Sequence, residues 1–438
     1  MKKGQLSELV AAAGIIGAGG AGFPASVKLR SQADTIIANG AECEPLLYSD
    51  YHCMMEQMDE IIEGLRLVME ALGAECGIIA IKKKRIELIE SARQRIAQMK
   101  GINVAELDDF YPAGDEHVLV HELLGRVVPH GGIPPDVGVV VHNVGTLAHI
   151  ARAAAREPVT WRYTTIAGAV KTPTTFRVPI GTPIGILVDA CGGPSIEEPI
   201  LLHGGTMMGA VVAGSQPVMK NTTGVVILPA SNLAAREPLD TLTHTTRIAM
   251  SVCDQCFTCT ELCPRWHLGH AIEPHRIMRR VGYGLPTGEP GLSNPAYCCE
   301  CGICSLYACP MGIYPRRLIQ YLKPSSPRPA PGSIPLKDVS PLIAEKRLPL
   351  KRLMERLHID QYDRLTVLAD APPVASVKIQ LRQGTGSPAQ PVVREGRRVK
   401  RGERIAEAGG PIGADHHASI DGVVSRIDEA IEIQAQRG

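Results

Sequence analysis

Residues 35–142 alternate short apolar runs with longer amphipathic stretches. The short runs predict buried strands, and the stretches with apolar residues three or four positions apart predict helices. The predicted strands are 35–38, 77–81, 102–107 and 137–142, and the predicted helices are 5–13, 52–72, 85–99 and 116–124. This alternation predicts a Rossmann-like α/β domain with a largely parallel sheet over residues 1–156. Its ligand would lie beyond the carboxyl ends of the strands, near loops 39–45, 111–117 and 142–146.

The pattern changes after residue 157. Residues 159–228 are rich in β-branched residues and interrupted by Pro and Gly, which predicts a β domain at 157–230. A partly helical domain at 244–325 holds most of the cysteines. The polar stretches 230–243 and 323–335 read as linkers. The last domain, 360–438, has no cysteine.

Composition narrows the function classes. The chain has 438 residues, of which 45% are hydrophobic and 21% charged, as in an ordinary globular protein. A net charge of +1 and only 4% aromatic residues argue against a nucleic-acid surface. No apolar stretch is long enough to span a membrane. The N-terminal residues superficially resemble a signal peptide, but Glu8 and the glycines that follow interrupt the apolar run. We therefore expect a cytoplasmic protein.

The strongest chemical signal is a repeated cysteine pattern. The first run is C-D-Q-C-F-T-C-T-E-L-C-P, and the second is C-C-E-C-G-I-C-S-L-Y-A-C-P. Each resembles the bacterial ferredoxin motif for a cubane cluster, in which the fourth cysteine of a run ligates the other cluster. The pattern therefore predicts two [4Fe–4S] clusters. One would be held by Cys253, Cys256, Cys259 and Cys309, and the other by Cys298, Cys301, Cys304 and Cys263.

Two other interpretations of these cysteines are weaker. A zinc site needs only four ligands, usually as two C-x-x-C pairs, whereas this spacing occurs as two runs of three. Disulfides are not expected in a chain long enough to build its own core. Two details leave the ligand set open. Four residues precede Cys309 where three are usual, and Cys299 is an alternative to Cys298 as first ligand.

A glycine-rich loop, G-I-I-G-A-G-G-A-G-F-P, runs from Gly14 to Pro24. Glycines let backbone N–H groups approach a phosphate or a flat ring closely. No strand clearly precedes the loop, so the standard dinucleotide fingerprint is not satisfied. A glycine-rich packing turn is the alternative interpretation.

This loop and Asn39–Pro45 (N-G-A-E-C-E-P) resemble the flavin site of the NADH-oxidising subunit of respiratory complex I and of the RnfC family. Tyr111–His117 and His142–Leu147 are similar to further loops of that site. The resemblance implies FMN as cofactor and NADH as reductant. One departure is Ala41, where complex I has an aspartate. The residues implied to line FMN are Gly17, Gly19, Gly20, Gly22, Phe23, Lys28, Asn39, Glu42, Asn143 and Thr146, the last two at its phosphate, and those implied beside NADH are Glu44 and Glu116.

The remaining domains carry resemblances of their own. Residues 157–230 resemble the β-grasp SLBB module of both groups, and Leu201–Gly209 resembles the glycine–methionine turn of RnfC. The two methionines in that turn read as packing residues. Residues 360–438 resemble a barrel-sandwich hybrid without a carrier lysine at the hairpin tip. Arg265 and the arginines of 276–280 form a basic stretch that could dock an acidic partner or simply face solvent.

The sandwich domain closes this chain, whereas it precedes the flavin loop in RnfC. That order resembles the cobalamin reductases of propanediol-utilisation microcompartments. The resemblance implies hydride transfer from NADH to FMN, then single electrons through both clusters to cobalamin. It also implies an adenosyltransferase and microcompartment shell proteins or enzymes as partners. No D-x-H-x-x-G motif is present, so cobalamin would dock transiently. The alternatives are an RnfC-like subunit of an NADH:ferredoxin complex and a non-enzymatic cluster-carrying scaffold.

Overall fold

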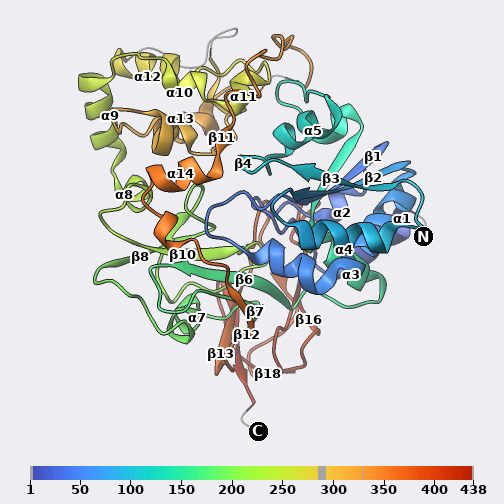
Figure 1. Ribbon diagram of the computed structural model, residues 1–438. Helices are drawn as coiled ribbons and strands as arrows, with labels where there is room; N and C mark the ends of the chain where they lie inside the picture. The colour runs from blue at the N-terminus through green and yellow to red at the C-terminus, as the bar shows by residue number, and fades with distance from the viewer. Residues whose placement is uncertain (1–2, 285–292, 329, 437–438) are drawn as a thin grey trace.

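A computed structural model describes residues 3–284, 293–328 and 330–436 (Figure 1). Its first domain contains a parallel sheet of order β3-β2-β1-β5. The strands are β1 (Thr35–Gly40), β2 (Cys76–Lys82), β3 (Ile102–Leu107) and β5 (Val139–Asn143). The helices are α1 (Lys3–Ala12), α2 (Ala25–Lys28), α3 (Ser49–Leu72), α4 (Ile86–Ile96), α5 (Glu116–Leu124) and α6 (Val144–Ala154), with a 3-10 turn η1 (Pro134–Val137). The predicted parallel sheet is confirmed.

Alternation along the strands assigns the helices to the two faces. Ile36 and Ala38 of β1 pack into one core with α1, α3, α4 and α6, whereas Ile37 packs into a second core with α5. Because β2 and β5 flank β1 on opposite sides, the strand order reverses at β1. A parallel sheet opens a crevice for ligands at such a point, beyond the carboxyl ends of the strands.

The second domain is built on a mixed six-stranded sheet of order β12-β7-β6-β10-β8-β9. Its elements are β6 (Trp161–Gly168), β7 (Thr174–Pro179), α7 (Ile184–Ala190), β8 (Pro199–His203), β9 (Ala210–Val212), β10 (Gly224–Pro229) and β12 (Val367–Asp370). The sequence analysis placed residues 367–370 in the C-terminal domain. In the structure they form β12, which pairs in parallel with β7 at the edge of this sheet, and the boundary at residue 360 stays a prediction.

The cysteine region is helical, as predicted, and lies beside both preceding domains (Figure 1). Residues 230–243, which the sequence analysis read as a linker, contain a helix that packs against the SLBB-like sheet. The elements are α8 (Leu233–Leu239), α9 (Leu242–Val252), α10 (Thr258–Glu261), α11 (Pro264–His267), α12 (Pro274–Gly282), η2 (Pro295–Tyr297), the π-helix η3 (Cys304–Ala308), α13 (Pro315–Leu322) and η4 (Lys323–Ser325).

After the cysteine region, the chain packs against the first domain before it forms the C-terminal domain. Strand β11 (Leu348–Pro349) pairs with β4 (Phe110–Tyr111), and it is followed by α14 (Leu350–Arg356) and η5 (Asp360–Tyr362). Two small sheets then enclose one apolar core, which is a sandwich. Their strands are β13 (Ser376–Gln380), β14 (Gln390–Pro391), β15 (Arg398–Val399), β16 (Arg404–Glu407), β17 (His416–His417), β18 (Gly422–Ile427) and β19 (Ala430–Ala435).

Candidate functional site

The glycine-rich loop follows α1 and folds back on itself. The Gly17 N–H donates to the Phe23 carbonyl at 2.8 Å, and the Ala18 N–H donates to Thr146 Oγ1 of α6 at 3.0 Å. Gly20 has φ +140°, and a Cβ there would meet nothing within 4 Å. The loop is therefore pinned at Ala18 and presents bare backbone at its tip. This arrangement fits a flat ring such as flavin.

The carboxyl ends of β1 and β5 supply two asparagines. Asn39 Nδ2 donates to the Gly114 carbonyl at 3.0 Å, which ties β1 to the loop before α5. Asn143 caps α6 by accepting from the Gly145 N–H at 2.8 Å. A Cβ on Gly19 would come within 3.3 Å of the Asn143 side chain. The glycine loop and the N-terminus of α6 are therefore in contact, as a shared FMN site requires.

Lys28 and Glu116 lie at the same edge of the sheet. Lys28 Nζ contacts Glu116 Oε1 at 2.6 Å and donates to the Val141 carbonyl at 2.9 Å. The Lys28 side chain is 22% exposed and the Glu116 side chain 41%. Both groups are thus reachable from solvent beside the glycine loop. Their roles at FMN and NADH stay predictions.

Glu42 has a local structural partner. Its carboxylate accepts from the Ser49 hydroxyl and from the N–H groups of Asp50 and Tyr51 at 2.9–3.1 Å. It therefore satisfies the first free N–H groups of α3 and adds a negative charge at the helix N-terminus. This role holds the loop after β1 in place whether or not Glu42 also contacts a flavin.

Glu44 reaches across to the second domain. Its carboxylate accepts from the N–H groups of Met207 and Met208, both at 2.9 Å. Burial raises the pKa of Glu44 to about 7, against the lowering effect of these hydrogen bonds. The glycine–methionine turn thus receives Glu44 through its backbone. The Met207 side chain is fully buried, as expected for packing, whereas Met208 is 54% exposed.

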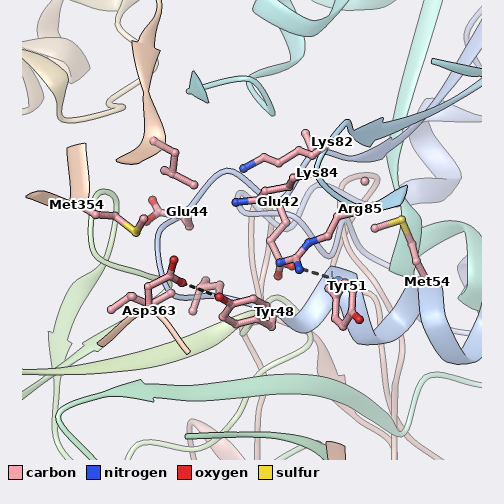
Figure 2. Close-up of a pocket in the computed structure, with 15 residues that line it drawn as sticks. Glu42, Glu44, Tyr48, Tyr51, Met54, Lys82, Lys84, Arg85, Met354 and Asp363 are labelled. Carbon is pink, nitrogen blue, oxygen red and sulfur yellow. Dashed lines mark hydrogen bonds between the residues drawn. The ribbon is translucent and has the colours of Figure 1, made fainter. Parts of the chain in front are cut away.

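Figure 2 shows the cavity onto which Glu42 and Glu44 open. Tyr48 closes one side by donating to Asp363 Oδ1 at 2.6 Å. Lys82, the last residue of β2, lines another side together with Lys84 and Arg85. Both lysines pair with Asp109 at 2.7 Å. Glu116 is not among the residues that line this cavity, so the two acids predicted at NADH open onto different parts of the site.

The first four cysteines of the second run line one cavity. Burial, and then Cys298, Cys259 and Cys263, raise the pKa of the Cys304 thiol well above its usual value. Cys263 of the first run lines the same cavity, and its place in the second ligand set stays a prediction. The residues lining the cavity include Cys263, Cys298, Cys299, Cys301 and Cys304.

The backbone of the second run winds around this cavity. Glu300 and Gly302 both have positive φ, and the Glu300 N–H donates to Cys298 Sγ at 3.2 Å. A Cβ on Gly302 would come within 2.9 Å of the Met207 carbonyl, so glycine is required there. Thiols around a cavity with a backbone donor to sulfur fit a cubane cluster. Both Cys298 and Cys299 line the cavity, so the choice of first ligand stays open.

The first run forms a matching set. Burial, and then Cys309, Cys256 and Cys253, raise the pKa of the Cys259 thiol to about 12. The extra residue before Cys309 is absorbed by the π-helix η3, which starts at Cys304, whereas the short helix α10 that carries Cys259 is α-helical. Within the described ranges, no group of three or more acidic, His or Cys side chains has the geometry for a single metal ion. The full ligand sets stay predictions.

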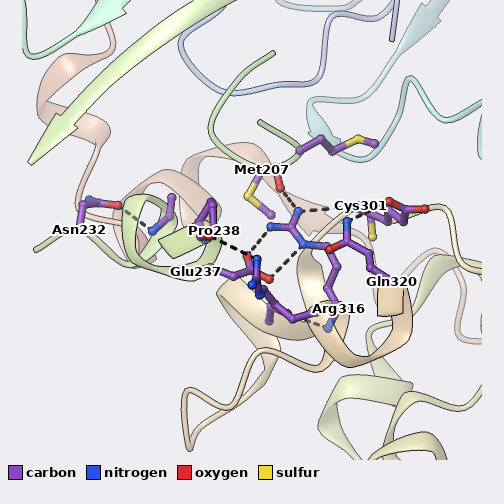
Figure 3. Close-up of polar contacts among 12 residues, drawn as sticks. Met207, Asn232, Glu237, Pro238, Cys301, Arg316 and Gln320 are labelled. Carbon is purple, nitrogen blue, oxygen red and sulfur yellow. Dashed lines mark hydrogen bonds and ion pairs between the residues drawn. The ribbon is translucent and has the colours of Figure 1, made fainter. Parts of the chain in front are cut away.

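Three polar contacts join the second cysteine set to the other domains. Tyr111 is 2% exposed, and its hydroxyl donates to the Cys301 carbonyl at 2.7 Å. Arg316 donates to the Met207 carbonyl and forms an ion pair with Glu237, which is fully buried (Figure 3). Arg265 pairs with Asp115 at 2.8 Å. The flavin domain and the Glu44 turn therefore both contact the second set directly.

Sequence reasoning missed most of these contacts. Arg265 was predicted to dock an acidic partner or to face solvent, but it is 9% exposed and pairs with Asp115. Glu237 fell in the supposed linker. A signal was present in the sequence, because charged residues among apolar neighbours next to cysteine runs are candidates for buried pairs. Their partners lie 79 to 150 positions away and could not be read from spacing.

The fold and the site define a flavin- and iron–sulfur-dependent electron-transfer protein. Family models match the Nuo51 FMN-binding domain at residues 10–152, the SLBB domain at 163–211, the 4Fe-4S dicluster domain at 252–314 and the RnfC barrel sandwich hybrid domain at 359–437. FMN and two [4Fe–4S] clusters are thus its cofactors, and the predicted multidomain fold is confirmed.

Curated relatives identify the family. The chain is 38% identical to cobalamin reductase PduS of Salmonella typhimurium over 430 residues, which covers 97% of this chain and 95% of the relative. It is 39% identical to PduS of Citrobacter freundii over 431 residues with the same coverage. The chain therefore belongs to the PduS cobalamin reductase family, as the sequence analysis expected.

More distant relatives match a smaller part of this chain. A component of the Na⁺-translocating ferredoxin:NAD⁺ oxidoreductase complex of Acetobacterium woodii is 37% identical over 271 residues, or 60% of this chain and 58% of that component. Among solved structures, an NAD⁺-reducing [NiFe]-hydrogenase in its H₂-reduced state matches with a TM-score of 0.50 and 20% identity. That match covers 78% of this chain and 66% of the hydrogenase chain, and it shows a shared fold.

Proposed function

We propose that this enzyme oxidises NADH and reduces cobalamin, as the name of its relatives states for them. FMN accepts a hydride and releases electrons singly, and the cubanes carry single electrons. The observation that supports this sequence best is the direct contact of Tyr111, in the flavin domain, with Cys301. A cluster-carrying scaffold would have no need of a buried connection between its thiols and a glycine-rich flavin loop.

The contacts of the two cysteine sets give the electrons a direction. The second set touches the flavin domain through Tyr111 and Arg265. The first set adjoins the second through Cys259, a neighbour of Cys304, and its Cys256 is exposed. We infer that electrons arrive at the second set and leave from the first. Cobalamin would dock transiently near Cys256.

The residues at the flavin would bind and orient the reactants. Bare backbone at Gly19 and Gly20 leaves room for the nicotinamide to stack on the ring. Glu116, already paired with Lys28, is close enough to the loop to position the nicotinamide nucleotide. Glu44 would act from the other side through the turn that it anchors.

The partners are inferred from the family alone. Reduced corrinoid would pass to an adenosyltransferase, and the enzyme would work in the cytoplasm inside a propanediol-utilisation microcompartment, beside its shell proteins or enzymes. In the described part of the chain, no helix is both long and apolar enough to cross a membrane. Co-purification with microcompartments from a cell that makes both would test this location.

The decisive experiment is an anaerobic titration of the purified protein with NADH, followed by absorbance with and without hydroxocobalamin. We expect flavin bleaching, then cluster reduction, then cob(II)alamin. Purified protein with iron–sulfur clusters but no flavin would instead identify a scaffold. Flavin bleaching that is never followed by cob(II)alamin would point to another acceptor.

Variants then test the nucleotide residues. Glu116→Gln should weaken NADH oxidation and leave the iron content intact, whereas Glu90→Gln, an exposed change on α4, should alter neither. Loss of iron in Glu116→Gln would count against its place at the nucleotide site.

A further inference from the structure

A groove of about 360 Å³ opens on the surface of the cysteine region. Helices α9, α12 and α13 line it, and they pack on one another at one end of the molecule (Figure 1). Its lining is mainly apolar, with Thr243, Thr246 and Arg247 as the polar side chains. None of the lining residues belongs to the flavin site or to either cysteine set. An apolar hollow with a few polar groups is typical of a site for a small molecule.

The floor of this three-helix groove connects it to the first cysteine set. Leu318, which is 1% exposed, belongs to a small buried apolar cluster. Leu242 and Val281 of the groove pack against this cluster, and so do Cys253 and Cys309 of the first set. A ligand in the groove would therefore lie across one small core from these thiols. Such a position suits the acceptor of electrons that leave the first set.

The open side of the groove carries groups that suit a ligand with a flat ring and a negative charge. Tyr321 is 65% exposed, so its ring offers a stacking surface. Arg247 is also exposed, and within the described ranges no ion pair includes its guanidinium. The three helices contain six arginines but no Asp or Glu, so none of them supplies a carboxylate that would neutralise this charge.

Cobalamin carries a flat ring and a negative charge together on its nucleotide tail. The tail hangs from one edge of the corrin ring and joins a planar dimethylbenzimidazole base to a ribose and an anionic phosphodiester. The groove is too small for a whole corrinoid, but it has room for such a tail. Aromatic side chains stack on planar bases, and arginine is well suited to bind a phosphate.

We propose that the three-helix groove binds the nucleotide tail of cobalamin, with Tyr321 against the base and Arg247 at the phosphodiester. The corrin ring would then lie over the rim of the groove, beside the first cysteine set. Tyr321 and Arg247 set the affinity for the corrinoid and take no part in the reduction of the cobalt. The inference rests on the proposed function and gives its acceptor a binding site.

The test compares hydroxocobalamin with diaquacobinamide, which has the same corrin ring but no nucleotide tail. NADH-dependent reduction of each by the full chain is followed anaerobically by absorbance. Arg247→Gln should raise the KM for hydroxocobalamin about 5-fold, the effect of one exposed ion pair. Tyr321→Ala should raise it about 5- to 10-fold, the lower part of the range for one stacked base. Neither variant should change kcat or the KM for diaquacobinamide.

Two exposed residues at the C-terminal end of α12, outside the groove, provide matched controls. Arg279→Gln removes the same charge and Tyr283→Ala the same ring, and neither should change either KM. An equal rise for both corrinoids in the groove variants, or an unchanged KM for hydroxocobalamin, would overturn the inference. A control variant that raises the KM for hydroxocobalamin as much as its groove counterpart would also overturn it.

The free tail, α-ribazole phosphate, tests the groove without any substitution. It should inhibit hydroxocobalamin reduction by the unaltered protein competitively, whereas inorganic phosphate at the same concentration should not. If the groove variants do not fold, a lack of inhibition by the free tail overturns the inference instead. An unaltered protein that reduces neither corrinoid would refute the proposed function itself.

Discussion

The two cysteine runs share a motif but sit in different surroundings. The second set is enclosed, with Cys301 and Cys304 buried and contacts to Tyr111, Arg265 and Arg316. The first set packs mainly against α9, α12 and α13, and its Cys256 is exposed. Residues with side chains that donate to first-set sulfurs, such as Thr258 and Gln255, come from the run itself.

This difference indicates that the same cysteine motif can build a rigidly held site and a site open to a partner. A site tied to two other domains by buried polar groups is held rigidly, which suits a fixed distance to a flavin. A site that reaches the surface suits a partner that comes and goes. This difference supports the proposed order, in which the second set receives electrons from the flavin and the first set passes them on.

The largest expected effect comes from removing one ligand of each set. In Cys256→Ala, NADH should still reduce the flavin and the second cubane, while cobalamin reduction is abolished. In Cys301→Ala, neither cubane should be reduced, although NADH still bleaches the flavin. Anaerobic electron paramagnetic resonance after NADH addition measures this. A second cubane that stays oxidised in Cys256→Ala would reverse the assigned order.

The next effect concerns the buried ion pair that supports the second set. Glu237→Gln leaves the buried Arg316 guanidinium without its counter-charge, which costs about 3–5 kcal/mol. We expect a lower unfolding midpoint and faster loss of iron from the second set. Glu355→Gln, which breaks a 4.0 Å pair with exposed Lys351, should change little. If both variants lose iron alike, the support does not come from this pair.

The sequence predicted the parts of this comparison that depend on local spacing. The positions of β1 and β2, the helix α5 and the two cysteine runs all follow from periodicity or motif. The surroundings that distinguish the two runs were not predicted, because Tyr111 and Cys301 are 190 positions apart and meet only when their two domains pack together.

A smaller effect should appear in the pH dependence of stability through Glu44. Burial raises its folded-state pKa from 4.5 to about 7, so the folded chain binds this proton more tightly than the unfolded chain. Stability should therefore fall as the pH rises from about 4.5 to about 7, by at most about 3 kcal/mol. Glu44→Gln removes this contribution. Its unfolding midpoint should depend less on pH over that range than that of the unaltered protein, and equal slopes would contradict the prediction.

The smallest expected effect comes from removing one hydroxyl beside each cysteine set. Tyr111→Phe removes the hydroxyl that donates to the Cys301 carbonyl, at a cost of about 1 kcal/mol, and loosens the contact between the flavin domain and the second set. Thr258→Val is the matched change in the first set, because it removes a hydroxyl 3.4 Å from the sulfur of exposed Cys256. Stopped-flow absorbance should show slower cluster reduction after flavin reduction in Tyr111→Phe but not in Thr258→Val, with NADH oxidation by an artificial acceptor unchanged in both. Since the second set receives electrons first, a delay caused by Thr258→Val alone would place the first set next to the flavin.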